Sequence, residues 1–537
     1  MEELVLTGDP IDLGALLRAS RGASNGSWRV RLADDAWIRV RSAREALLAG
    51  TEAAYGLTTG LGAHAYGEGG GGKRGSGPAD ADPESSSHED VIVAHATTLA
   101  PVPASLLEVR AAVVCWCNQA CSRTGGVPGV SAELVASLLG WVNDRCSAAP
   151  MLDALEATDP GFGAIVVNCQ LALQLLRASG ARCRAGEALP LMSHSNLLAA
   201  RCAVLAEELA ALLRTSAAVG ALSLAGFGGH PELFEDARRW TAASHFEAGG
   251  AADLAAWMRC GESGSSDASA DSSGGGSDIG GGVDVAPQRW APRRLQDPLD
   301  LRCMAGPLGT LAAALEGLKE TLARLTACAQ CNPVVLPRAG IGGAGSFEAG
   351  GQTSAHFDTT ALRAGLGSVC TALGEACGRS HQRACTLASP HLNGGLPVGL
   401  SRPAVSTAGG GSVGGSGDGG SGGDRCGVHN RNLAVIGASL AHVALAAASH
   451  QPTGVSVWAA DGVECAAAFS AQVQLLVQYL VQHLAQLLVQ HLVWHLAQLL
   501  VQHLVWHLTQ PATRARQGGL EALLQMVWTG SAGALGP

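Results

Sequence analysis

Apolar residues recur at intervals of three and four along most of this chain, which is the spacing of one face of an α-helix. Leu and Ala dominate these stretches. We therefore expect helices over residues 91–125, 131–146, 164–179, 187–225, 307–329, 359–387 and 432–449. Helices of this length and character pack into bundles. The predicted fold class is therefore mainly α, with a central bundle of long antiparallel helices.

The first 50 residues differ from this helical pattern. Apolar and polar residues alternate at Trp28–Leu32 and again at Trp37–Val40, which predicts two short strands. A helical stretch follows at Ala43–Leu48. These elements predict a small mixed N-terminal lobe over residues 1–65, which ends in a glycine-rich loop around Tyr55.

Low-complexity sequence interrupts the helical pattern at three places. Residues 66–90 consist mostly of Gly, Ser, Asp and Pro and predict a flexible loop. Residues 261–285 and 408–423 are inserts of similar character. Because the sequence on either side of each insert is incomplete as a bundle by itself, we interpret residues 91–470 as one helical domain with two inserts.

The last segment, residues 471–537, is repetitive. The sequence HLAQLLVQHLVW occurs at His483–Trp494 and again at His495–Trp506, with Gln and His along one face of a Leu/Val helix. We interpret it as an amphipathic helix that forms an oligomer contact. A membrane span is the weaker alternative, because every turn would carry an amide or an imidazole. His491 and His495 have metal-ligand spacing, but no carboxylate lies nearby and we expect no metal site.

Composition narrows the function classes further. The formal net charge of −10 and the absence of a basic cluster argue against a nucleic-acid partner. The first residues, MEELVLT, lack the basic and apolar regions of a signal peptide, so we expect a cytoplasmic protein. The 16 cysteines are then expected to be reduced thiols packed in helices. This includes Cys115 with Cys117 and Cys328 with Cys331, which lack a second pair at zinc-ligand spacing.

Several motifs occur in the order found in one enzyme family. The loop YGLTTGLG at Tyr55–Gly62 resembles the Tyr-Gly-x-x-Thr-Gly-Phe-Gly loop of the aromatic amino acid ammonia-lyases, which include the histidine and phenylalanine ammonia-lyases. The segment QDPLDLRC at Gln296–Cys303 resembles their Gln-Asp-x-Tyr-Ser-Leu-Arg-Cys segment. Shorter matches are Ala94–Ala96, Asn332–Val334, Gly345–Glu348 and Gln451–Ser456.

The resemblance implies non-oxidative elimination of ammonia from a small aromatic amino acid, without an external cofactor. The electrophile of the family is 4-methylideneimidazol-5-one, which forms from the chain's own Ala-Ser-Gly. Tyr55 would be the base or proton carrier, and Arg302 would bind the substrate carboxylate through both arms of its guanidinium. His95 would face the substrate ring, which favours histidine, and Phe347 would lie beside the electrophile. The other substrate-binding positions implied are Gly62, Ser193, Gln296, Asn332 and Gln451.

The residues taken alone have other interpretations. Tyr55 would be an incidental phenol in a glycine-rich turn, and His95 a histidine satisfied in the core. Arg302 would form an ion pair with Asp297 or Asp300. The resemblance also implies a homotetramer whose active sites combine residues from more than one subunit.

The chain departs from the family where the electrophile should form. By landmarks, Ala157-Thr158-Asp159 replaces Ala-Ser-Gly, and the Cβ of Asp159 hinders the tight bend that glycine permits. The intact Ala178-Ser179-Gly180 ends a helical stretch, and we expect Gly180 to be a helix cap.

Other departures concern the residues around the electrophile. Ser193 stands where the family has Asn, Leu299 where it has Tyr, and Pro452 where it has Glu. We therefore expect impaired lyase activity. The alternative function is that of a non-catalytic helical homologue, which acts as an oligomeric scaffold or partner subunit.

Overall fold

The fold is that of a computed structural model of the chain. The structure describes residues 1–23, 25–51, 55–57, 88–96, 101–153, 164–260, 294–338, 346–356, 358–389 and 391–392. By its internal contacts the chain divides into two compact units. Among the described residues, unit 1 contains Met1–Leu213 and Pro307–Gly378, and unit 2 contains Arg214–Gly306 and residues 379–392.

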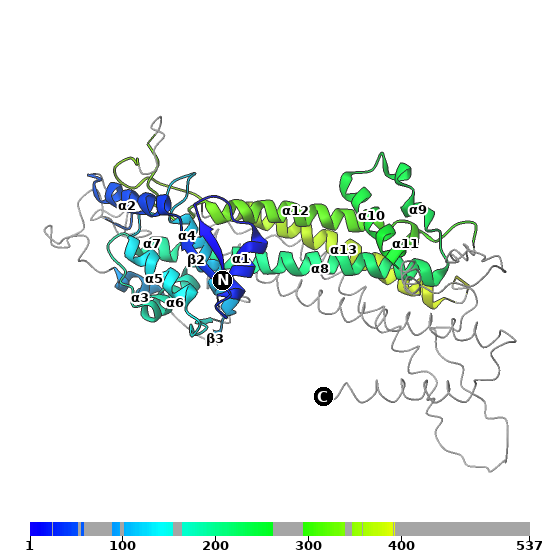
Figure 1. The fold of residues 1–537 in the computed structure, drawn as a ribbon, viewed down its shortest axis with the longest axis horizontal. Coiled ribbons are helices and arrows are strands. Elements are labelled where there is room, and N and C mark those ends of the chain that lie inside the picture. The colour runs from blue at the N-terminus through cyan, green and yellow to red at the C-terminus, as the bar shows by residue number, and fades with distance from the viewer. Residues whose placement is uncertain are drawn as a thin grey trace, which may run out of the picture. The chain divides into compact units, whose positions relative to one another are not determined.

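Helices make up most of the described chain (Figure 1). The strands are β1 (Glu2–Leu6), β2 (Trp28–Leu32), β3 (Pro101–Pro103) and β4 (Met151–Asp153). The helices are α1 (Leu13–Gly22), α2 (Asp34–Leu48), α3 (Glu89–His95), α4 (Leu106–Gln119), α5 (Ala132–Asn143), α6 (Ala164–Ser179), α7 (Ala188–Met192), α8 (Asn196–Phe227), α9 (Glu232–Glu235), the 3-10 helix η3 (Ala237–Trp240), α10 (His245–Cys260), α11 (Leu299–Arg302), α12 (Ala305–Ala327) and α13 (Thr360–Ala388). The prediction of a mainly α chain is confirmed.

Two parallel strands and a connecting helix begin unit 1. β1 pairs with β2, and along β2 the side chains alternate, so that Val30 and Leu32 are buried. α1 lies between the strands in sequence, and the Asp12 carboxylate caps it by accepting a hydrogen bond from the Ala15 N–H at 2.8 Å. The strand expected at Trp28–Leu32 is confirmed.

The second expected strand, Trp37–Val40, is wrong, because these residues lie in α2. The buried positions of α2 recur at helical spacing, and they are Ala36, Arg39, Val40, Ala43, Arg44 and Leu47. Asp34 and Asp35 stand in the first turn, where negative charge favours a helix N-terminus. The apolar residues of Trp37–Val40 fit both the strand period and the helix period. The helical spacing of the longer buried face of α2 decides between them.

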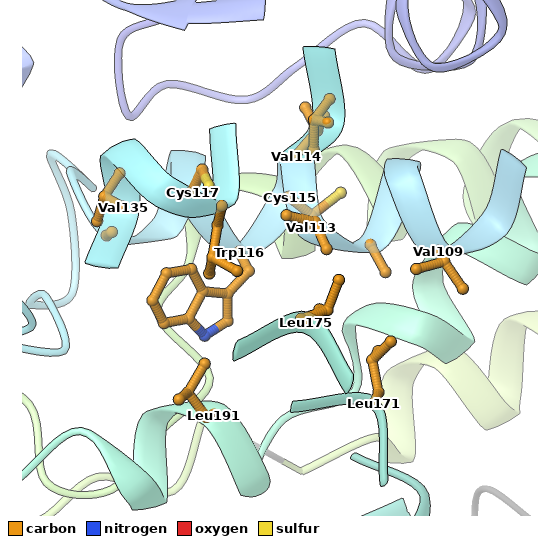
Figure 2. Packing of buried hydrophobic residues seen from close by; sticks show 14 of the residues in the cluster. Val109, Val113, Val114, Cys115, Trp116, Cys117, Val135, Leu171, Leu175 and Leu191 are labelled. Atoms are coloured by element: carbon orange, nitrogen blue, oxygen red, sulfur yellow. The ribbon is translucent and has the colours of Figure 1, made fainter. Parts of the chain in front are cut away.

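α4 lies in the main apolar cluster of unit 1. Every residue from Val109 to Gln119 is buried, and the helix packs against α1 and α5. Figure 2 shows the Trp116 ring beside Leu191 and Leu175. The Trp116 Nε1–H donates to the Pro190 carbonyl oxygen at 2.7 Å, so this large side chain is buried with its polar group satisfied.

Two of the expected helices are divided in the structure. The stretch 91–125 contains most of α3, then β3, then α4. Pro101 and Pro103 lack backbone donors and favour an extended segment at this point. The stretch 187–225 contains α7 and most of α8, which are separated by Ser193–Ser195.

In unit 2, α10 approaches the C-terminal part of α8 at a glycine. Leu254 of α10 is fully buried, and a Cβ on Gly220 would lie 2.9 Å from its Cδ2 atom. Glycine at position 220 therefore permits the close packing. Within the described ranges, no helix is both long and apolar enough to cross a membrane.

Candidate active site

The predicted site residues are distributed over both units. Tyr55, His95, Ser193, Asn332 and Phe347 belong to unit 1. Gln296 and Arg302 belong to unit 2. Gly62, Ala157, Thr158, Asp159 and Gln451 lie outside the described residues, as do the inserts 261–285 and 408–423 and the repetitive segment 471–537.

Tyr55 lies in a turn that is attached to unit 1 through Leu57. Gly56 has a φ of 70°, a conformation that glycine adopts without steric cost. Tyr55 itself is half-buried. The Leu57 side chain packs on a small apolar cluster, which consists of Ala43, Leu47, Val127, Val335 and Phe347. Two predicted pieces of the site, the tyrosine turn and Phe347, therefore share one cluster.

Phe347 and Asn332 lie in segments joined by isolated β-bridges. Phe347 pairs with Pro337, and Val335 pairs with Val127. The Asn332 side-chain oxygen accepts a hydrogen bond from the Ser354 N–H at 2.9 Å, and the Asn332–Pro333 peptide bond is cis. The amide oxygen of Asn332 therefore serves to fix this turn.

Ser193 begins a connection between α7 and α8 that is held by Gln330. The Gln330 Oε1 atom accepts hydrogen bonds from the Ser195 N–H at 2.8 Å and from the Ser195 hydroxyl. Both side chains are buried. Sequence reasoning missed Gln330, which lies two residues before the Asn332 motif.

Further buried amides surround this connection. Gln119 and Asn196 exchange side-chain hydrogen bonds of 2.7 and 3.0 Å. The Asn168 Nδ2 atom donates to the carbonyl oxygens of Met192 at 2.9 Å and His194 at 2.6 Å. Buried amides are almost always paired in this way. The available sequence signal was the presence of Gln119 and Asn168 inside otherwise apolar helices.

His194 is part of the same connection and is buried. Its Nδ1 atom lies 3.3 Å from the Asn196 N–H, which donates to it. Burial lowers the pKa of His194 to about 4, because the charged imidazolium would lose its hydration. His194 is therefore neutral near pH 7.

His95 lies in the last turn of α3 and is exposed. Its Nδ1 atom is 2.8 Å from the Val91 carbonyl oxygen. A carbonyl can only accept, so Nδ1 carries the proton, and in the neutral ring Nε2 is an acceptor. The alternative interpretation of His95 as a buried core histidine is wrong.

Gln296 and Arg302 are in direct contact in unit 2. With the Gln296 amide oriented to satisfy both groups, its oxygen accepts hydrogen bonds from Arg302 Nη1 at 2.6 Å and Nη2 at 2.7 Å. Arg302 is half-buried and Gln296 is exposed. Among the described residues, the buried Nε of Arg302 has no hydrogen-bond partner.

Of the two carboxylates near Arg302 in sequence, Asp297 contacts His230, whereas a buried oxygen of Asp300 has no hydrogen-bond partner among the described residues. The Asp297 Oδ2 atom accepts from the His230 N–H at 2.7 Å and lies 3.1 Å from His230 Nδ1. Burial lowers the pKa of Arg383 to about 10, and the negative charge of Asp300 opposes this shift. Leu299, the position of the family tyrosine, is exposed. In the described part of the chain, Arg302 therefore contacts Gln296 and forms no ion pair with either aspartate.

Cysteines and the second tripeptide behave as expected. Every described cysteine is a free thiol, although Cys146 and Cys385 are exposed rather than buried. The described residues contain no group of three or more His, Cys, Asp or Glu side chains that could hold a metal ion. Gly180 follows the end of α6 with a φ of 68°, which confirms its role as a helix cap.

Comparisons with known proteins agree with these observations. A sequence model of the family "Aromatic amino acid lyase" matches residues 158–417. No curated protein matches by sequence.

Similar solved structures include the ergothioneine-degrading enzyme ergothionase from Treponema denticola, with 20% identity, a TM-score of 0.62, and coverage of 90% of this chain and 89% of that one. Histidine ammonia-lyase from Trypanosoma cruzi has 15% identity, a TM-score of 0.61, and coverage of 91% and 84%. Tyrosine aminomutase from Streptomyces globisporus has 16% identity, a TM-score of 0.62, and coverage of 90% and 86%. At these identities the likeness establishes the fold. The family model and the shared fold together support the resemblance of this chain to the aromatic amino acid lyases.

Proposed function

We propose that this chain eliminates ammonia from an aromatic α-amino acid, with L-histidine as the favoured substrate and urocanate as its product. The observation that carries the proposal is the contact between Arg302 and Gln296. The Gln296 oxygen accepts from both Nη atoms of the guanidinium, which are donors that a substrate carboxylate could also use. Gln296 is exposed, so its side chain can turn away when a substrate carboxylate binds.

The family resemblance supplies the other roles in the proposal. Tyr55 would take the proton from the β-carbon of the substrate, which requires the phenolate form. Phe347 shares its cluster with Leu57 of the same turn and would pack near the reacting group. Among the remaining predicted residues, Ser193 and Asn332 would line the substrate site, and so would Gly62 and Gln451.

His95 supports histidine rather than phenylalanine. Its protonated Nδ1 donates to Val91, so Nε2 is left as an acceptor for the N–H of a substrate imidazole. A phenyl ring offers no such donor. One of the structural neighbours is a histidine ammonia-lyase.

The prosthetic group of the family fits this sequence poorly. In relatives it supplies the electrophile that activates the amino group. Here Thr158 would place a methyl group on the reactive carbon, and Asp159 replaces the glycine that allows the bend. We therefore assign no step to this group and expect low activity.

The poor fit favours a second candidate, a non-catalytic homologue that serves as an oligomeric scaffold or partner subunit. In both cases we propose a homotetramer in the cytoplasm, as the family resemblance implies. Light scattering of the purified full chain would give its mass, and a monomer would contradict the tetramer.

The two candidates differ in amino acid binding and turnover. We would titrate the full chain with L-histidine by calorimetry and measure ammonia, urocanate and any β-amino acid formed. Arg302→Lys keeps the positive charge but loses the planar guanidinium with its paired N–H donors, so the affinity for L-histidine should fall by roughly tenfold or more. Arg259→Lys, at an exposed position of α10, is the matched control and should bind normally. Binding without ammonia release would support the non-catalytic candidate, and equal binding by both variants would contradict the role of Arg302.

A further inference from the structure

The segment Cys183–Glu187 contacts the turn that carries Tyr55. Gly186 has a φ of 82°, and a Cβ built on it would lie 3.1 Å from the Leu57 Cδ1 atom. The same Cβ would lie 3.5 Å from Leu47 Cδ2 and 3.7 Å from Arg44 Nη1. Leu57 is therefore held between Gly186 on one side and the Leu47 and Phe347 cluster on the other.

This segment is firmly fixed by hydrogen bonds. The Arg44 Nη1 atom donates to the Ala185 carbonyl oxygen at 2.8 Å. The Glu187 carboxylate, which is completely buried, accepts from the N–H groups of Ser131 and Arg184, both at 2.7 Å. Charge-assisted hydrogen bonds of this kind are strong and directional. The backbone at Gly186 is therefore a rigid surface.

His88 adds a connection to α3. The His88 Nδ1 atom accepts a hydrogen bond from the Gly186 N–H at 3.3 Å. The backbone N–H of His88 donates to the Cys183 carbonyl oxygen at 3.0 Å. His88 immediately precedes α3, which ends at His95. The same short segment thus touches the tyrosine turn and supports the helix that carries His95.

We propose that Gly186 positions Tyr55, because the missing Cβ lets Leu57 seat the turn against the fixed Cys183–Glu187 segment. Gly186 and Leu57 are positioning residues, since neither is required to touch the substrate. The proposal rests on the role of Tyr55 in the proposed function. A misplacement of about 1 Å at a reacting group can lower a rate by roughly 100-fold.

The position of Tyr55 can be measured without any activity. The chain contains three tyrosines, so full-length protein labelled with 3-fluorotyrosine gives few fluorine NMR resonances, and Tyr55→Phe identifies the Tyr55 signal. We expect Gly186→Ala to shift this signal by more than its linewidth. Gly180→Ala is the matched control, because Gly180 also has a positive φ but its Cβ would meet nothing within 4 Å.

A second pair of variants covers the case in which Gly186→Ala fails to fold. Leu57→Ala removes the contact from the other side and should shift the same resonance. Leu107→Ala, at another half-buried leucine of unit 1, is its control. An unchanged Tyr55 signal in Gly186→Ala or Leu57→Ala, or equal shifts in the controls, would overturn the proposal. A lack of ammonia release would overturn the proposed function and leave the fluorine result intact.

Discussion

Gln330 and Ser195 are joined by two hydrogen bonds, although 135 residues separate them in the chain. One amide oxygen satisfies both the N–H and the hydroxyl of Ser195. The pair thereby connects the segment after α12 to the start of α8. It fixes the Ser193–Ser195 connection more directly than any residue that the family motifs indicate.

We predict that Gln330→Ala lowers the free energy of unfolding by about 1–3 kcal/mol, because it leaves buried polar groups of Ser195 without their acceptor. Chemical denaturation of the full chain would measure the change. Gln352→Ala is the control, since the Gln352 side chain is exposed and its backbone bonds to Val334 remain. Equal unfolding midpoints for the two variants would contradict the prediction.

His194 should make the stability depend on pH. Its pKa is about 4 in the folded chain, against 6.5 for an ordinary histidine side chain, so between these pH values only the unfolded chain binds the proton. The free energy of unfolding should therefore fall by about 3 kcal/mol as the pH falls from 7 to 4. His88, whose pKa burial also lowers, adds to the fall in the same direction.

The contribution of His194 is isolated by His194→Asn, whose side-chain oxygen can accept from Asn196 but does not titrate in this range. Its stability should fall less between pH 7 and 4 than that of the unmodified chain. His391→Asn alters an exposed histidine and should leave the pH dependence unchanged. Parallel curves for all three proteins would show that His194 is not the group responsible.

Thiol reactivity should separate the exposed from the buried cysteines. Burial raises the pKa of Cys115, Cys169 and Cys202 to about 12, against an ordinary thiol value of 9.0. Their thiolate fraction near neutral pH is then about 1000-fold lower, and steric protection adds to this. Iodoacetamide labelling followed by peptide mass measurement should therefore modify Cys146 first. Early modification of Cys115 in the native chain would contradict its burial.

His230 should support the carboxylate-binding segment through Asp297. His230→Ala removes the imidazole contact of 3.1 Å from a carboxylate that is almost completely buried. We expect a loss of about 1–3 kcal/mol in the free energy of unfolding and weaker binding of L-histidine, because Asp297 is adjacent to Gln296. His245→Ala, at an exposed residue of the same unit, should change neither quantity.

The sequence predicted the helical character of the chain, and it marked Gln296 and Arg302 as site residues without predicting their contact. Gln296 and Arg302 were both assigned from one segment, and the structure joins them directly. The tyrosine turn and Phe347 were assigned from distant motifs, and they share a cluster through Leu57. In both cases the motifs marked the residues, and the fold supplied the contact.

The other contacts and the element boundaries depended on tertiary structure, which no local sequence pattern encodes. Gln330 and Ser195 lie outside the helices and are brought together only by the tertiary fold, and a lone glutamine in sequence gives no partner. The division of the stretch 91–125 was missed because the apolar spacing on either side outweighed Pro101 and Pro103. Trp37–Val40 was too short to distinguish a strand from a helix.

The most direct measurement combines turnover with the chemistry of the peptide that contains residues 151–182. Purified full chain is incubated with L-histidine, and urocanate and ammonia are followed together, with Arg302→Lys alongside. The peptide mass is then measured with and without borohydride. We predict slow, equimolar release of both products, lost in Arg302→Lys, with most of the peptide unmodified because Thr158 and Asp159 hinder the cyclisation. No product from histidine, phenylalanine or tyrosine, together with an unmodified peptide, would contradict lyase activity.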